Sequence, residues 1–222
     1  MFRVKICGIT RVEDALAAAE SGADAVGLNF YPKSRRAIDL ARAAEIVAAL
    51  PEGITKVGLF VNAEPKTICG TFDRLGLDLV QLHGDEPPEF IADLGGRPVL
   101  RAFRLGPEGL KPVADYLTAC RQQGTPLAGV LFDALVEGSY GGTGKVADWS
   151  VVATYQRQIG SAPPCVLAGG LTPTNVADAI RTAHPFGVDT ASGVEASPGR
   201  KDPALVAAFV QAARSAFAVP GD

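Results

Sequence analysis

The sequence lacks the features that direct a chain into or across a membrane. Its first ten residues, MFRVKICGIT, contain no long apolar run after a basic start, so they do not form a secretory signal. No stretch approaches the roughly 20 uninterrupted apolar residues that a membrane-spanning helix needs. We therefore expect a soluble, cytoplasmic protein that makes no use of a membrane.

Cysteine pairs that bind metals and an excess of positive charge are also missing. The four cysteines, at positions 7, 69, 120 and 165, have no CxxC or other metal-ligand spacing, so we expect free thiols and no metal site. The net charge is −3 and there is no strongly basic stripe, which gives nucleic-acid binding no electrostatic support. A small anionic substrate would be held by local groups rather than by an overall field.

Strand-like and helix-like segments alternate along the whole chain. Short runs rich in Val, Ile and Leu, without polar alternation, predict strands that helices cover. The predicted strands span residues 3–7, 25–30, 56–61, 79–83, 99–103, 129–133, 165–168 and 187–190. The predicted helices that follow them span residues 12–21, 40–50, 65–75, 88–94, 110–123, 149–159, 174–183 and 203–217.

Eight repeats of strand and helix are what a closed parallel barrel requires. The sequence shows no shift of composition, low-complexity tract or linker, so residues 1–222 are expected to form a single (β/α)₈ TIM-barrel domain of the α/β class. An open doubly wound sheet is the alternative, although it usually has fewer strands and a switch point in strand order.

The barrel predicts where the reactive residues meet, because its active site lies at the C-terminal ends of the strands. Polar residues that close the predicted strands should therefore line one site. They are Cys7, Asn29, Asn62, His83, Arg104 and Asp133, together with the glycines after the seventh and eighth strands.

Glycine-rich loops follow the last two predicted strands. Gly169 and Gly170 follow the seventh strand, and Ser192 and Gly193 follow the eighth. Barrels often hold phosphate between these loops, because glycine lets backbone N–H groups approach the oxygens and a short helix adds its positive end. The segment from Ser192 is expected to open such a helix. We predict a phosphate site here, with plain tight turns as the alternative.

Two reactive side chains close the first and sixth predicted strands. Cys7 can remove a carbon-bound proton once its pKa falls below about 8.5, for which a backbone N–H or a helix start is a candidate cause. Asp133 can donate a proton if it is protonated near neutral pH. A substrate between them can gain one proton and lose another. The alternatives are a cysteine that only fills space and an aspartate that caps the next loop.

A polar, glycine-rich segment follows Asp133 at residues 137–145. It is long for a connection between a strand and a helix. We predict a lid that excludes water when it closes, with an ordinary surface loop as the alternative.

An ordered set of motifs resembles the phosphoribosylanthranilate isomerase family. Each motif alone is modest, but together they touch seven of the eight repeats, which makes the set highly specific. The motifs are KICGIT (5–10), GADAVGLNFYPKSRR (22–36), VGLFVN (57–62), VQLHGDE (80–86), YGGTGK (140–145), DW (148–149), LAGGLTPTNV (167–176) and VDTASGVEASPGRKD (188–202).

The resemblance implies an isomerase of tryptophan biosynthesis that needs no metal or organic cofactor. Its reaction is an Amadori rearrangement, the third step from chorismate, which converts N-(5-phosphoribosyl)anthranilate to 1-(2-carboxyphenylamino)-1-deoxyribulose 5-phosphate. Asp133 would be the general acid that opens the sugar ring, and Cys7 the general base that removes the C2′ proton.

The resemblance also implies substrate-binding residues. Arg36 matches the family position that binds the anthranilate carboxylate, which suits a guanidinium because the pair can be bidentate. Arg35 beside it is a second candidate, and a solvated loop charge is the alternative for both. His83 and Asp189 are expected near the substrate, where Asp189 orients a hydroxyl or caps the loop.

Three other functions are open. The isomerase of the histidine pathway performs the same rearrangement on a larger substrate with two phosphates, but it has an aspartate where this chain has Cys7. A related hypothesis is a dual-substrate enzyme that acts on the substrates of both pathways. A non-catalytic phosphosugar-binding protein would have lost the acid or the base, and both are present. A scaffold domain from a longer tryptophan-pathway fusion is less favoured than a free-standing enzyme. We expect a monomer, with a homodimer as the alternative, and a small phosphorylated substrate.

Overall fold

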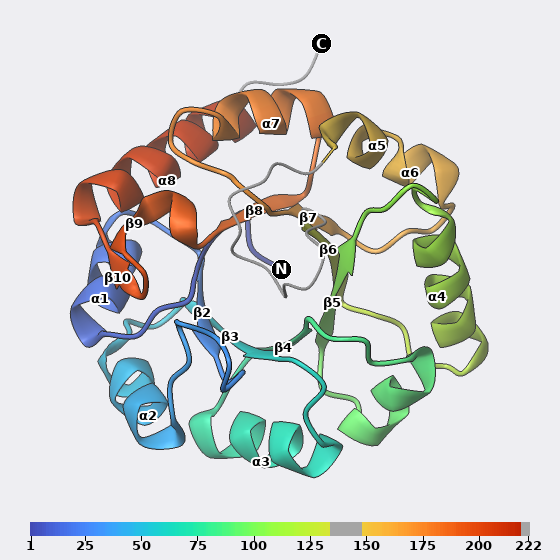
Figure 1. Cartoon of the computed structure of the whole chain (residues 1–222), viewed down its shortest axis with the longest axis horizontal. Coiled ribbons are helices and arrows are strands. Elements are labelled where there is room, and N and C mark those ends of the chain that lie inside the picture. Colours follow the sequence, from blue (N-terminus) through green and yellow to red (C-terminus); the bar gives the residue numbers. More distant parts are fainter. Residues whose placement is uncertain (134–147, 219–222) are drawn as a thin grey trace.

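The computed structural model describes residues 1–133 and 148–218, and it contains a closed barrel of eight parallel strands. The strands follow one another around the ring in sequence order, and the last one pairs with the first (Figure 1). They are β1 (Val4–Cys7), β2 (Ala25–Asn29), β3 (Thr55–Phe60), β4 (Leu79–Leu82), β5 (Val99–Arg104), β6 (Gly129–Asp133), β7 (Cys165–Leu167) and β8 (Gly187–Thr190). The predicted barrel is confirmed, and the open doubly wound sheet is wrong because β8 pairs with β1.

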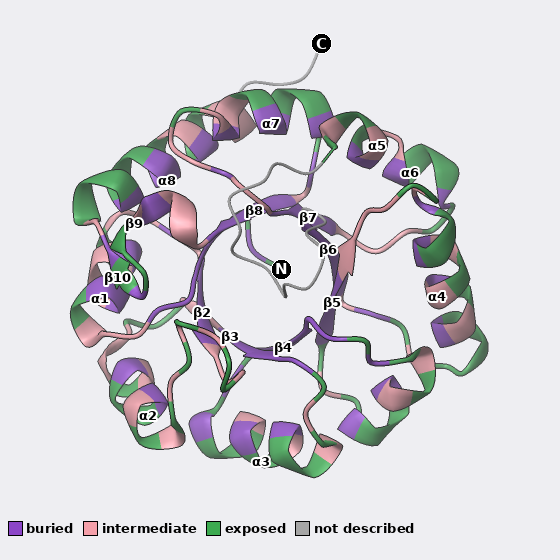
Figure 2. Ribbon diagram, viewed as in Figure 1, coloured by how far each residue is buried: buried purple, intermediate pink, exposed green. Residues whose placement is uncertain are grey.

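Helices surround the ring of strands, and their outward faces are exposed (Figure 2). They are α1 (Val12–Glu20), α2 (Leu40–Ala49), α3 (Pro65–Leu75), the 3-10 helix η1 (Pro88–Leu94), α4 (Lys111–Gln122), α5 (Trp149–Ala153), α6 (Tyr155–Gln158), α7 (Val176–Ala183) and α8 (Pro203–Ala218). Local signals fix several ends. Proline at the first position begins α3, and Gly76 ends it with a φ of 57°.

Two predicted helices differ from the structure. The helix expected at residues 149–159 is divided at Thr154, whose hydroxyl donates to the carbonyl of Val151 at 2.8 Å and competes with the regular helical ladder. The segment at 88–94 forms the 3-10 helix η1 instead of an α-helix, because it is short, begins with a proline that lacks an N–H, and is stopped by Gly95 at a φ of 61°.

Side chains alternate between the outside and the inside of the barrel, as a strand's period of two requires. On β1, Val4 and Ile6 belong to the core between strands and helices, so Lys5 and Cys7 point toward the barrel axis. The deep inner positions form an apolar layer of Phe2, Ala25, Val57, Leu79, Leu100, Ala102, Leu131, Val166 and Ala168. Nearer the C-terminal ends the inner positions include the polar residues Lys5, Gln81, His83, Asp133 and Asp189, beside a small apolar cluster of Cys7, Leu59 and Val61.

A small hairpin follows β8. It consists of the 3-10 helix η2 (Ser192–Val194), then β9 (Glu195–Ser197) paired with β10 (Arg200–Lys201). The predicted helix after the eighth strand is therefore a single 3-10 turn, and Glu195 starts a strand instead of extending it. No helix in the described ranges is both long and apolar enough to cross a membrane.

Candidate active site

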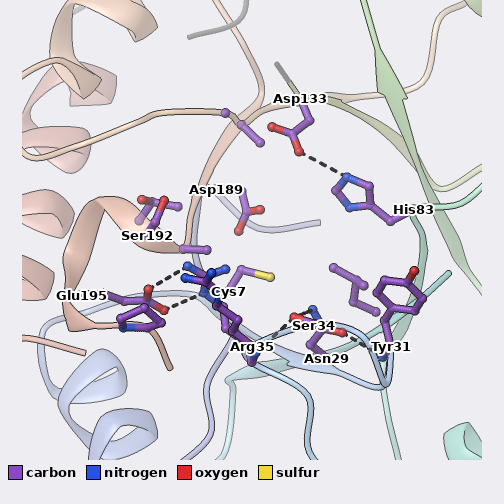
Figure 3. A pocket seen from close by; sticks show the side chains of 18 of the residues that line it. Cys7, Asn29, Tyr31, Ser34, Arg35, His83, Asp133, Asp189, Ser192 and Glu195 are labelled. Carbon is purple, nitrogen blue, oxygen red and sulfur yellow. Dashed lines mark hydrogen bonds and ion pairs between the residues drawn. The ribbon is translucent and has the colours of Figure 1, made fainter. Parts of the chain in front are cut away.

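A cavity of about 830 Å³ opens at the C-terminal ends of the strands. This volume is within the usual range for small-molecule sites. Eight of the nine catalytic and substrate-binding residues predicted from the sequence line it: Cys7, Arg36, His83, Asp133, Gly169, Gly170, Asp189 and Ser192. Figure 3 shows His83 and Asp133 on one side of the space, and Cys7 and Asp189 on the other. The chain thus gathers residues from six of its eight strand-and-helix repeats into one site.

Two of the residues expected to line the site do not. Asn62 has a φ of 49°, and its side-chain oxygen accepts from the backbone N–H of Asp85 at 2.7 Å. Arg104 donates to the carbonyl of Gly84 and to Asp85. Both side chains connect the loop after β4 to its neighbours, so the end of a strand does not by itself place a residue in the cavity.

The loops after β7 and β8 are held against each other. The hydroxyl of Thr190 donates to the carbonyl of Leu171 at 2.7 Å. A Cβ at Gly193 would lie 1.9 Å from that same carbonyl oxygen, so only glycine permits this approach. Of the nine predicted catalytic and substrate-binding residues, Gly193 alone does not line the cavity, because it is pressed against the β7 loop. Its place is to bring the two glycine loops together.

Gly169 and Gly170 both have positive φ values, 83° and 65°. Other residues adopt such conformations rarely, which explains the glycine pair. The carbonyl of Gly170 accepts from the side chain of Asn175 at 3.0 Å, which fixes the loop before α7 begins. The backbone of this loop is therefore ordered where it borders the cavity.

Cys7 lies at the end of β1 above a buried ion pair. Lys5 Nζ donates to Asp189 Oδ1 at 2.8 Å, and the Lys5 side chain is completely buried. Burial disfavours the ammonium, but Asp189 and Cys7 outweigh that effect and raise the pKa of Lys5. Burial also raises the pKa of the Cys7 thiol, while the charge of Lys5 acts in the opposite direction.

Asp133 ends β6 and contacts a histidine from β4. Its Oδ2 lies 3.2 Å from His83 Nε2, and both side chains are buried (Figure 3). The other ring nitrogen of His83 lies 3.1 Å from the amide nitrogen of Gln81, which is a donor. With Nδ1 as the acceptor, His83 carries its proton on Nε2, the ring nitrogen that lies 3.2 Å from Asp133. Gln81, His83 and Asp133 therefore form one polar row across the mouth of the barrel.

Arg36 is held by a carboxylate from the hairpin after β8. Its Nε and Nη2 each donate to Glu195 at 2.7 Å, in a bidentate pair. Lys201 adds a contact from its Nζ to the same carboxylate at 3.1 Å and donates to the carbonyl of Ala191 at 2.8 Å. Glu195 uses two of the five N–H donors of the guanidinium. Among the described residues the other donors meet no acceptor, and Arg36 borders the cavity.

The two neighbouring arginines differ in their surroundings. Arg36 has a side chain that is 14% exposed, whereas Arg35 is an exposed residue at the rim of the cavity. The ordered guanidinium of Arg36 is thus the better prepared of the two for a bidentate contact.

Several residues of the site were not found from the sequence. Lys5, Gln81 and Lys201 were not singled out, and Glu195 was read only as part of a helix start. A signal was available for two of them, because Lys5 and Gln81 are polar residues inside short apolar strands. The predicted lid at residues 137–145 lies outside the described residues.

Comparison with known proteins agrees with the motifs. The model of the N-(5'phosphoribosyl)anthranilate (PRA) isomerase family matches residues 4–212. The chain belongs to this family. Its members include the N-(5'-phosphoribosyl)anthranilate isomerase of Pseudomonas paraeruginosa, which is 54% identical over 217 residues that cover 96% of this chain and 95% of the relative.

Solved structures of the PRA isomerase family have the same barrel. The phosphoribosyl anthranilate isomerase of Thermotoga maritima matches with a TM-score of 0.85 and 40% identity over 97% of this chain and 100% of its own. A second structure of this kind, in complex with reduced 1-(o-carboxyphenylamino)-1-deoxyribulose 5-phosphate, matches with a TM-score of 0.82 and 39% identity over 97% and 100% of the two chains. The predicted family and fold are therefore confirmed.

Proposed function

We propose that this chain converts N-(5-phosphoribosyl)anthranilate to 1-(2-carboxyphenylamino)-1-deoxyribulose 5-phosphate, the third step of tryptophan biosynthesis from chorismate. The observation that carries this proposal is the placement of Cys7 and Asp133 on opposite sides of one cavity, in a chain of the PRA isomerase family (Figure 3). A family structure with a reduced product-like ligand supports the same substrate class.

Asp133 acts as the general acid. It gives a proton to the ring oxygen of the ribose, the bond from C1′ to that oxygen breaks, and the anilino nitrogen forms a protonated Schiff base. The contact at 3.2 Å with His83 holds one carboxyl oxygen of Asp133, which borders the cavity where the substrate would lie. The same histidine N–H then stabilises the carboxylate that remains.

Cys7 acts as the general base. Its thiolate takes the proton from C2′, and the electrons of that C–H bond neutralise the Schiff base and form an enolamine. The enolamine tautomerises to the ketone, so the net reaction is an isomerisation. A buried, oriented acid and base suit these two proton transfers. Asp133 donates its proton on one side of the substrate, and Cys7 removes the C2′ proton on the other.

The remaining predicted residues bind the two ends of the substrate. The glycine loops after β7 and β8, with Gly169, Gly170, Ser192 and Gly193, hold the phosphate through backbone N–H groups. Arg36 binds the anthranilate carboxylate with the donors that Glu195 leaves unused. Asp189 borders the cavity close to Cys7 and binds a ribose hydroxyl.

The test is turnover of phosphoribosylanthranilate that is generated in place from anthranilate and phosphoribosyl pyrophosphate. The native chain should consume it rapidly, and the Asp133→Asn variant should lose about 10²- to 10⁴-fold in kcat while its circular dichroism stays native. No turnover by a folded native chain would overturn the substrate assignment. Normal turnover by the variant would remove Asp133 as the acid.

A further inference from the structure

A buried lysine lies directly below the thiol of Cys7. Lys5 and Cys7 are two residues apart on β1, so both point into the barrel, with Lys5 one layer deeper. Cys7 lines the cavity and Lys5 does not. A Cβ at Gly27 of β2 would lie 2.7 Å from Cys7 Sγ and 3.1 Å from Lys5 Cε. The sulfur and the end of the lysine side chain thus fill the space that this glycine leaves.

The ammonium of Lys5 has room for a second partner besides Asp189. Lys5 and Asp189 face each other in register on β1 and β8, and their contact of 2.8 Å uses one N–H. An ammonium has three donors, and buried donors need acceptors. The sulfur of Cys7 is the neighbouring group that becomes a strong acceptor when it ionises.

Charged or titratable groups from seven other segments surround this side of the cavity or face it. They are Arg36 after β2, Asp189 on β8, Glu195 on β9, Lys201 on β10, Asp14 on α1, which accepts from the backbone N–H of Lys201, and Asp133 with His83 across the cavity. Beside the thiol, three basic side chains (Lys5, Arg36 and Lys201) face two carboxylates. A thiolate at Cys7 brings this group to charge balance.

We propose that Lys5 is a positioning residue whose buried ammonium stabilises the Cys7 thiolate and sets the pH above which Cys7 accepts a proton. The inference rests on the proposed role of Cys7 as the base. It also explains how a buried sulfur can serve in that role. When the sulfur takes a proton, Lys5 is still paired with Asp189, so the reaction leaves no buried cation without a partner.

The test measures the thiolate directly, without substrate. Iodoacetamide alkylates thiolates, so the rate at Cys7 against pH reports its ionisation, and peptide mass spectrometry separates Cys7 from the other three cysteines. In Lys5→Met we expect alkylation of Cys7 at pH 7 to be about tenfold slower, with the whole profile moved to higher pH. Lys56→Met is the matched control, since Lys56 pairs with Asp78 at 3.0 Å and lies away from the cavity.

A second background protects the test against a folding defect. Lys5→Met leaves the buried Asp189 without its cation, which can unfold the chain. In an Asp189→Asn background, Lys5→Met leaves no buried carboxylate without its cation, so Lys5→Met is also compared with Lys5 there. Alkylation of Cys7 should be slower without Lys5 in this pair as well. Lys56→Met should leave the Cys7 profile unchanged.

Equal Cys7 profiles with and without Lys5, in whichever background folds, would overturn the inference. Turnover provides a separate readout, in which the acid limb of kcat/KM for Lys5→Met should move to higher pH. A native chain that shows the Lys5-dependent thiolate but no turnover would contradict the proposed function and not the role of Lys5.

Discussion

The pair formed by Arg36 and Glu195 offers a sharp test of how the site is held together. Glu195→Gln keeps the shape of the side chain and removes its charge. The side chains of Arg36 and Glu195 are 14% and 5% exposed, and Lys201 beside them is fully buried. The substitution therefore leaves two poorly solvated cations facing each other without the carboxylate between them.

The expected cost follows from burial. Removing one partner of a buried pair typically destabilises a protein by about 3 to 5 kcal/mol, and the amide oxygen of Gln still accepts one hydrogen bond, so we expect the lower end. For a chain of this size, about 3 kcal/mol lowers the Tm by roughly 6 to 12 °C. Thermal unfolding at pH 7, monitored by circular dichroism, measures this change in Tm.

A matched control is available on the outside of the barrel. Arg97 and Asp73 form the same kind of forked pair, with contacts of 2.8 and 2.6 Å from Nη2, but the Asp73 side chain is 61% exposed. Asp73→Asn should therefore change stability very little, because water screens the pair. If Glu195→Gln costs no more than Asp73→Asn, the argument from burial is refuted.

The pH dependence gives the loss a second signature. Burial opposes ionisation of Glu195, but the hydrogen bonds from Arg36 and the charge of Lys201 outweigh it and hold its pKa below the ordinary 4.5. A lowered pKa contributes stability that is fully present above pH 4.5 and is lost as the pH falls through the folded-state value. The difference in the free energy of unfolding between the native chain and Glu195→Gln should be constant near neutral pH and become smaller only in acid.

Two further predictions concern the roles of single residues. Cys7→Ser should lower kcat by about 10²- to 10⁴-fold with little change in Tm, because a hydroxyl is a far poorer base; near-native kcat would exclude Cys7 from proton transfer. Arg36→Ala should raise KM about tenfold or more with a smaller effect on kcat, and Arg35→Ala should change neither. Initial rates with phosphoribosylanthranilate measure both, and a loss of kcat at unchanged KM would contradict the binding role of Arg36.

The barrel was predictable because its signals are local. Each strand is a short apolar run, and each helix carries its own start or stop, such as Pro65 and Gly76 for α3. Cys7 and Asp133 could be found for a related reason, since the ends of parallel strands converge wherever the barrel closes. Local sequence patterns therefore predicted the strands and placed Cys7 and Asp133 at the mouth of the barrel, although the polar residues Lys5 and Gln81 inside two strands were missed.

The contacts between distant segments could not be read in this way. Lys5 pairs with Asp189 across 184 residues, and Arg36 pairs with Glu195 across 159. The local sequence around one member of such a pair does not indicate which distant residue will be its partner. The prediction that Asn62 and Arg104 line the cavity was wrong for a different reason. Both lie at the ends of strands as expected, but their side chains form hydrogen bonds with the loop after β4. Sequence periodicity gives the direction of a side chain from its strand, but not the groups it meets at the rim.

The pairing of β1 with β8 links the site to the order in which the chain is made. Lys5 is synthesised 184 residues before Asp189, which follows only after the first seven strands of the barrel. Until then the barrel has an open seam, and the lysine that the closed fold buries is still accessible to water. The active site is therefore one of the last parts of the molecule to be assembled. A fragment that stops before β8 would contain Cys7 and Asp133 but not the seam that joins them into one enclosed site.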